Sequence, residues 1–260
     1  MQEATRKRCA VTPAGTTVNL RDSRDNKVYR VRKMADGNCW MVENLAFDLA
    51  NPSAPTFNPA AALSVVGVSN VDTKAQYIAN TGFSTAAGQA TYLYNWCAAL
   101  GDTSANCAAS VSAVDLGTVD AGGILNSTGS ATSQPEVVGI CPAPFRLPKG
   151  GPDVSVVGTV NEFVRLDISM GGTGTYRSNA NTYPDFMSTA ATDKSWAGVL
   201  SEHFRTGIHN QGVGYWWTST ASSATKSYGL GLTSSNSAVN ITGAGFGHDK
   251  LVGFAVRCTL

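Results

Sequence analysis

Cysteine is the residue type with the clearest chemistry in this sequence. The chain has six cysteines, and none of them has the CxxC or similar spacing of a zinc site. An even number of cysteines without metal spacing favours disulfides, which persist in an oxidising compartment. The six residues are Cys9, Cys39, Cys97, Cys107, Cys141 and Cys258.

The positions of the cysteines along the chain suggest how they pair. The first proposed bond joins an upstream segment to a predicted hairpin, the second closes a short local loop, and the third ties together the two ends of a long C-terminal lobe. Sequence alone leaves other connectivities open. The predicted pairs are Cys9 with Cys39, Cys97 with Cys107, and Cys141 with Cys258.

The three histidines, His203, His209 and His248, are a weaker candidate for chemistry. His203 and His209 are six positions apart, which places them on different faces of a helix, unlike an i, i+4 pair. We therefore interpret all three as ordinary surface or loop histidines. Because the sequence contains no other coherent catalytic or ligating set, we predict a non-enzymatic protein without a cofactor or a metal.

A run of aromatic residues, Tyr215-Trp216-Trp217, could form a recognition surface. Adjacent side chains of a strand face opposite ways, so Tyr215 and Trp217 share one face and Trp216 takes the other. Two alternatives stay open: the rings are all packed beneath the rest of the chain, or one face is an exposed platform for sugar rings or peptide. The candidate binding residues are Tyr215, Trp217 and, in the next strand, Tyr228.

The elements that position these residues follow from the apolar pattern. Alternation predicts strands over 17–20, 27–34 and 39–45 and again over 215–220, 227–232, 238–241 and 253–258, with a tight turn at Asp36-Gly37. A capping-box pattern from Thr159 to Glu162 predicts a helix over 160–170 that ends at Gly171, and a weaker helical stretch covers 196–204. Strands, helix and strands without regular βαβ alternation indicate an α+β fold.

Residues 46–140 have a different composition from the rest of the chain. They are rich in small residues and poor in charges, which predicts a loop-rich excursion with apolar anchors such as Tyr94 and Trp96. We predict a single domain over 1–260. Its parts are N-terminal strands and a hairpin (1–45), the excursion (46–140), and a helix followed by C-terminal strands (141–258).

Charge and hydropathy exclude some classes of partner. Residues 1–33 carry nine Lys or Arg against three Asp or Glu, although the whole chain has a net charge of +1. Acidic and apolar residues interrupt the basic stretch, so we interpret it as a solvated strand face and predict no nucleic-acid partner. Because the sequence has no long apolar run and no signal-peptide core, membrane attachment is expected only through a missing signal or anchor.

Several short motifs occur in an order that resembles a known family. Together they resemble the Fibrobacter succinogenes major paralogous domain family, whose fold is similar to that of C-type lectins and the formylglycine-generating enzyme. The resemblance implies a disulfide-stapled, C-type-lectin-like domain with short antiparallel strands and long loops, secreted by a bacterium or exposed on its surface. The motifs are Asp22 to Tyr29, Asp36 to Leu45, Tyr94-Asn95-Trp96, Cys141 to Pro148, Tyr215 to Thr220, and Gly253 to Cys258.

The sequence also departs from the chemistry of those relatives. Gln134-Pro135-Glu136 is its only approximation of the calcium-binding triplet of C-type lectins, and it precedes Cys141, on the wrong side of the helix. We therefore interpret it as a coincidental turn. An oxidase like the formylglycine-generating enzyme would need two nearby cysteines late in the chain, where only Cys258 is found.

The sequence thus predicts an extracellular or cell-surface binding or adhesion domain. It would present a variable loop surface to a glycan, a surface protein or another cell. The alternative is a structural module of the cell envelope or of a pilus without a specific small ligand. A formylglycine-generating-like oxidase is the third interpretation.

Overall fold

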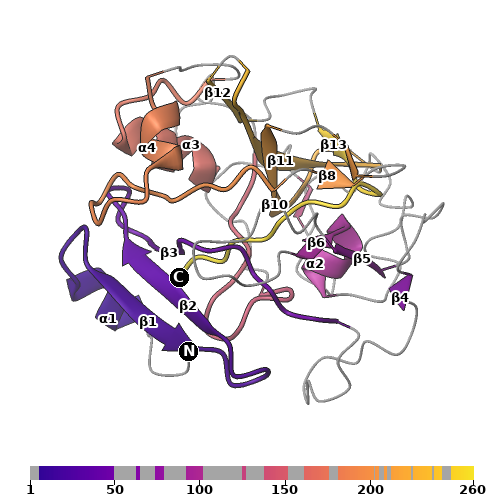
Figure 1. The fold of residues 1–260 in the computed structure, drawn as a ribbon, viewed down its shortest axis with the longest axis horizontal. Helices are drawn as coiled ribbons and strands as arrows, with labels where there is room; N and C mark the ends of the chain where they lie inside the picture. The colour runs from indigo at the N-terminus through magenta and orange to yellow at the C-terminus, as the bar shows by residue number, and fades with distance from the viewer. Residues whose placement is uncertain are drawn as a thin grey trace.

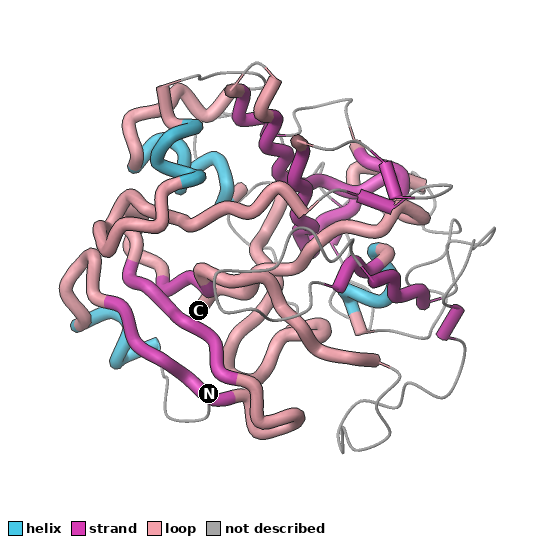
Figure 2. The backbone as a smooth tube through the Cα atoms, in the orientation of Figure 1, coloured by secondary structure: helices cyan, strands magenta, loops and turns pink. Residues whose placement is uncertain are grey.

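The structure is a computed structural model with mixed helices and mostly antiparallel sheets (Figures 1 and 2). It describes residues 6–49, 63–64, 74–78, 92–101, 125–126, 138–151, 161–175, 181–201, 203–204, 208–209, 212–223, 225–235, 237–241 and 247–260. Strands outnumber helices among these residues, and the α+β class predicted from the sequence is confirmed.

The first sheet contains the predicted N-terminal strands and hairpin. Its order is β1 (Thr17–Arg21), β2 (Val28–Lys33) and β3 (Cys39–Met41), and both pairings are antiparallel. Gly37 has a φ of +88° in the turn between β2 and β3, a backbone conformation that favours glycine. The turn expected at Asp36-Gly37 is therefore present, although β3 is shorter than predicted.

The second sheet contains the aromatic strand. Its order is β12 (Ala238–Ile241), β11 (Lys226–Thr233), β10 (Val213–Ala221) and β7 (Leu125–Asn126), and β13 (His248–Asp249) also pairs with β11. The pairing of β10 with β7 is parallel and the others are antiparallel. The three strands predicted over 215–241 are confirmed.

Two smaller sheets complete the described strands. One has the order β4 (Leu63–Ser64), β5 (Lys74–Ile78) and β6 (Tyr92–Tyr94). The other pairs β8 (His203–Phe204) with β9 (Ile208–His209). Most of the predicted excursion over 46–140, including Gln134-Pro135-Glu136, lies outside the described residues.

The described helices are short. They are α1 (Arg6–Val11), α2 (Trp96–Leu100), α3 (Glu162–Ser169) and α4 (Tyr183–Met187), and none of them is long and apolar enough to cross a membrane. α3 confirms the helix predicted over 160–170, but its N-cap is Asn161, and Thr159 lies outside the described residues. The Glu162 carboxylate is bound by the Arg146 guanidinium at 2.6 and 2.8 Å. The predicted capping box between Thr159 and Glu162 lies partly outside the described residues.

The weaker helix predicted over 196–204 is wrong. Ala197 has a φ of +56°, outside the helical region, and the chain then forms β8. The carbonyl oxygens of Trp196 and Ala197 accept hydrogen bonds from the Arg257 guanidinium, which comes from the end of the chain. The Arg257 side chain thus binds carbonyl oxygens that, in a helix, would accept hydrogen bonds from the helix's own N–H groups.

The last residues of the chain form an extended segment that touches several elements. The predicted strand over 253–258 makes isolated bridges to β6, β8 and β10, and Thr259 bridges Trp40 and Arg146. In Figure 1 this yellow segment enters the middle of the molecule, between the first and second sheets. It therefore connects the sheets without forming a regular ladder.

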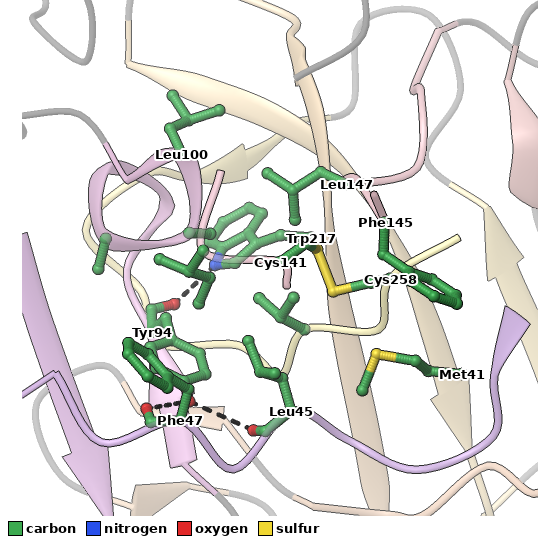
Figure 3. Close-up of a cluster of buried hydrophobic side chains, with 14 of the residues drawn as sticks. Met41, Leu45, Phe47, Tyr94, Leu100, Cys141, Phe145, Leu147, Trp217 and Cys258 are labelled. Carbon is green, nitrogen blue, oxygen red and sulfur yellow. Dashed lines mark hydrogen bonds between the residues drawn. A yellow bond between two sulfur atoms is a disulfide. The ribbon is translucent and has the colours of Figure 1, made fainter. Parts of the chain in front are cut away.

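Two predicted disulfides are confirmed, Cys9–Cys39 and Cys141–Cys258. Cys97 is also disulfide-bonded, and its predicted partner Cys107 lies outside the described residues. Figure 3 shows Cys141–Cys258 inside a cluster of buried apolar side chains drawn from all three predicted parts of the chain. A second buried cluster includes Trp40, Phe163, Trp196 and Trp216.

Candidate functional site

The two tryptophans of the aromatic run lie on opposite faces of β10, and both are buried. Trp216 and Trp217 are each 0% exposed and belong to different core clusters. The Trp216 Nε1–H donates to Asn44 Oδ1 at 2.8 Å, and the Trp217 Nε1–H donates to the Tyr94 carbonyl at 2.7 Å. Trp217 therefore packs beside the Cys141–Cys258 disulfide, as Figure 3 shows, and does not form an exposed platform.

The other two candidate binding residues have different environments. Tyr228 is 5% exposed and belongs to the interior of the second sheet. Tyr215 is only half-buried and lies at the edge of the first core cluster. Of the three side chains predicted to bind a ligand, Tyr215 is thus the one that the structure leaves accessible.

Glycines on the neighbouring strand make room for rings on this face of the sheet. Gly231 and Gly229 of β11 pair with Tyr215 and Trp217 of β10. A Cβ atom on Gly231 would lie 2.7 Å from the Tyr215 ring, and one on Gly229 would lie 3.2 Å from the His248 ring. The bare backbone of β11 therefore allows aromatic side chains to lie directly against it.

Two histidines join Tyr215 in a cluster of rings. The ring centroid of Tyr215 is 5.2 Å from that of His203 and 5.1 Å from that of His248, both with edge-on geometry. Phe254 stacks on Tyr215 at 4.8 Å. β8, β10, β13 and the C-terminal segment each contribute one of these rings.

A cavity of about 310 Å³ opens at this ring cluster. We call it the Tyr215 cavity. Its polar side chains are two imidazoles, a phenol, an ammonium and a carboxylate, so it combines an aromatic wall with hydrogen-bonding groups. The described lining residues are His203, Tyr215, Lys226, Gly247, His248, Asp249, Val252 and Phe254.

His248 is held in its neutral form in this cavity. Burial, then the nearby charges of His203 and Lys226, lower the pKa of His248 to about 4. The Nε2 atom of His248 is buried and has no hydrogen-bond partner among the described residues. A neutral imidazole whose Nε2 atom has no partner among the described residues therefore lines the cavity.

Lys226 and Asp249 supply the charged groups of the cavity. They occupy directly opposed positions of β11 and β13. Lys226 is exposed, whereas Asp249 is half-buried and its Oδ1 accepts a hydrogen bond from the Leu251 N–H at 3.1 Å. The two opposite charges leave the polar side of the cavity close to electrically neutral at pH 7.

Our interpretation of the histidines did not anticipate this site. His203 and His209 are directly opposed residues of the β8–β9 pair, so the argument from helical spacing does not apply to them. Among the described side chains, no group of three or more His, Cys, Asp and Glu residues is arranged to hold a metal ion. The alternating glycines of β11 were the sequence pattern that could have indicated this site. They show that one face of the strand has no side chains, so that rings from other segments can pack against it.

No family model, curated protein or solved structure matches the chain in comparisons with known proteins.

Proposed function

We propose that the protein is a non-enzymatic binding or adhesion domain, secreted by a bacterium or displayed on its surface, with the Tyr215 cavity as its ligand site. The proposal includes a C-type-lectin-like fold and membership of the Fibrobacter succinogenes major paralogous domain family, on the motifs given above. The disulfides support a location outside the reducing cytosol. The ligand would be a unit of a glycan or of another cell's surface protein.

The observation that carries this proposal is a buried nitrogen of His248, at the wall of a cavity, that lacks a hydrogen-bond partner among the described residues. Nearly all buried polar atoms of folded proteins have a hydrogen-bond partner. Several exceptions occur among the described residues, and the Nε2 atom of His248 is one that belongs to a residue of the Tyr215 cavity. The Nε2 atom of His248 has no such partner among the described residues. A ligand hydroxyl group in the Tyr215 cavity would supply one.

The chemistry of the lining favours a hydroxyl-rich ligand without a large charge. A hydroxyl group both donates and accepts, so it can meet the neutral imidazole of His248, the ammonium of Lys226 and the carboxylate of Asp249. The aromatic wall offers apolar contact to the C–H face of a sugar ring. A saccharide unit therefore fits the lining better than a strongly charged ligand does.

Glycan-array screening followed by calorimetric titration of the best ligand tests the proposal. We expect Lys226→Gln and His248→Gln to weaken binding by at least about tenfold, the loss of roughly one charged or buried hydrogen bond. Lys194→Gln is the matched control, because Lys194 is an exposed lysine outside the cavity lining. That control should bind like the unmodified protein.

The same experiment separates this proposal from its alternative. A structural module of the cell envelope or of a pilus would give no specific hit on glycan arrays or in pull-downs with host-cell surface proteins, even though the protein is folded. A ligand whose affinity is equal in all three variants would also contradict the Tyr215 cavity as the site. Either result would favour the structural module or a different surface.

A further inference from the structure

A second cavity of about 310 Å³ lies where α1 meets the first sheet, and we call it the Cys9 cavity. Both residues of the Cys9–Cys39 disulfide line it. Around them are apolar side chains of β1 and β2 and two basic side chains. The described lining residues are Arg8, Cys9, Thr12, Thr16, Val18, Asn19, Leu20, Val31, Lys33, Cys39, Phe145 and Leu260.

The two described disulfides differ in their access to a small molecule. All four cysteines belong to the first core cluster, but Cys9 and Cys39 are 6% and 7% exposed and line an open cavity, whereas Cys141 and Cys258 are 2% and 0% exposed and do not line it. Thiol–disulfide exchange requires a thiolate to reach one sulfur atom directly. The Cys9 cavity therefore offers an approach that the core around Cys141–Cys258 does not.

A buried ammonium lies beside one of the two sulfur atoms. The Lys33 Nζ atom is 3.9 Å from Cys9 Sγ, and Lys33 is 9% exposed. A neighbouring positive charge stabilises a thiolate, and a better stabilised thiolate is a better leaving group. Lys33 thus favours a reaction in which Cys9 is released and Cys39 is attacked.

Release of Cys9 would remove the covalent attachment of the first helix. Cys9 is the one buried side chain of α1, and its other five side chains are exposed, including Val11 at 81%. α1 therefore contributes little apolar packing besides this residue. Once the bond is broken, α1 loses its covalent attachment and is held by the polar interactions of Arg6 and Arg8 and by the main chain.

We propose that Cys9–Cys39 is a site of thiol–disulfide exchange for a small-molecule thiol that enters the Cys9 cavity. The thiolate attacks Cys39 Sγ, a mixed disulfide forms at Cys39, and Cys9 leaves as a thiolate beside Lys33. A second thiolate then attacks the mixed disulfide, which releases the oxidised dimer of the small thiol and leaves Cys39 reduced. Two electrons pass from the two thiols to the protein disulfide, and α1 loses its covalent link to β3. This activity is independent of the Tyr215 cavity.

Timed exposure of the folded protein to reduced glutathione, with alkylation and peptide mass spectrometry, tests this proposal. We expect Cys9–Cys39 to open at least about tenfold faster than Cys141–Cys258, with the glutathione adduct on Cys39. Hydrogen exchange should rise in residues 6–11 and stay unchanged in β10 and β11. Equal opening rates, earlier opening of Cys141–Cys258, or an adduct mainly on Cys9 would overturn the proposal.

Substitutions at Lys33 test the assigned role of its charge. Lys33→Met should slow the opening of Cys9–Cys39 by about threefold or more, because the leaving thiolate loses its neighbouring cation. Lys33→Arg keeps the charge and should restore much of the rate, which separates electrostatics from altered folding. Lys7→Met, at an exposed lysine of α1 itself, is the matched control and should leave the rate unchanged. Equal rates in all three variants would refute the role of Lys33.

Discussion

Similar aromatic residues lie in two different environments of the second sheet: its buried interior, and the Tyr215 cavity at its edge, which we call the rim. In the interior, the indole N–H groups of Trp216 and Trp217 both have partners, and neither residue is exposed. At the rim, Tyr215 is half-buried and the neighbouring His248 has a buried nitrogen without a partner among the described residues. The two regions therefore differ in access: the interior rings are enclosed, whereas the rim leaves Tyr215 half-buried beside a cavity. Buried nitrogens without a partner among the described residues occur in both regions, because Trp196 Nε1 in the second core cluster is another.

Arg257 is the place where the interior depends most on satisfied polar atoms. Its guanidinium is fully buried, and burial lowers the pKa of Arg257 to about 9. It donates to Asn44 Oδ1 and to the carbonyl oxygens of Trp196 and Ala197, and it stacks on the Trp196 ring at 4.1 Å. This one side chain joins the C-terminal segment to the turn that replaced the predicted helix.

The largest expected effect is therefore that of Arg257→Met. The change leaves three acceptors without this donor and removes the stacked cation, so the free energy of unfolding should fall by about 3–5 kcal/mol. Chemical denaturation measures it. Arg165→Met, at an exposed arginine of α3, is the matched control and should change stability by less than about 0.5 kcal/mol. A similar small change in both variants would show that the interior does not depend on this network.

His248 should make the rim sensitive to acid. Its folded-state pKa of about 4 is below the unfolded value of 6.5, so its contribution is fully present above pH 6.5 and is lost as the pH falls to about 4. The shift corresponds to a loss of about 3 kcal/mol over that window. The nearby charges of His203 and Lys226 add to the effect of burial, since both lower the pKa of His248.

The His248→Gln variant isolates this effect. Chemical denaturation of both proteins at intervals from pH 7 to pH 4 gives the free energy of unfolding at each pH. This free energy should fall further in acid for the unmodified protein than for the variant, because the variant lacks the titrating group. An equal fall in both proteins would mean that the fold does not hold His248 in its neutral form. The proposed electrostatic difference between rim and interior would then be wrong.

Local sequence patterns predicted the parts of the fold that depend on neighbouring residues. Alternation located β1, β2, β10, β11 and β12, and position along the chain gave the pairs Cys9–Cys39 and Cys141–Cys258. The helix expected over 196–204 failed because Arg257, far along the chain, binds the carbonyl groups of Trp196 and Ala197. α1 has six residues, too few to show an apolar period.

The candidate site was only partly predictable, because its residues are far apart in the sequence. Tyr215 was identified because an aromatic run in a strand is visible in the sequence. His203 and His248 come from two-residue strands, and only the fold brings them to Tyr215. Local sequence patterns do not predict which distant segments come into contact. For the same reason, they did not predict that Trp217, on the same strand face as Tyr215, is buried.

The most direct test of the Tyr215 cavity is a nuclear magnetic resonance measurement of the imidazole nitrogens. The chain has only three histidines, so each can be followed in a spectrum of the protein with and without the best glycan-array ligand. We expect the Nε2 resonance of His248 to move most when the ligand saturates the protein, and the resonances of His203 to move as well. A ligand that binds to saturation and leaves both imidazoles unchanged would contradict the assignment of this cavity as the binding site.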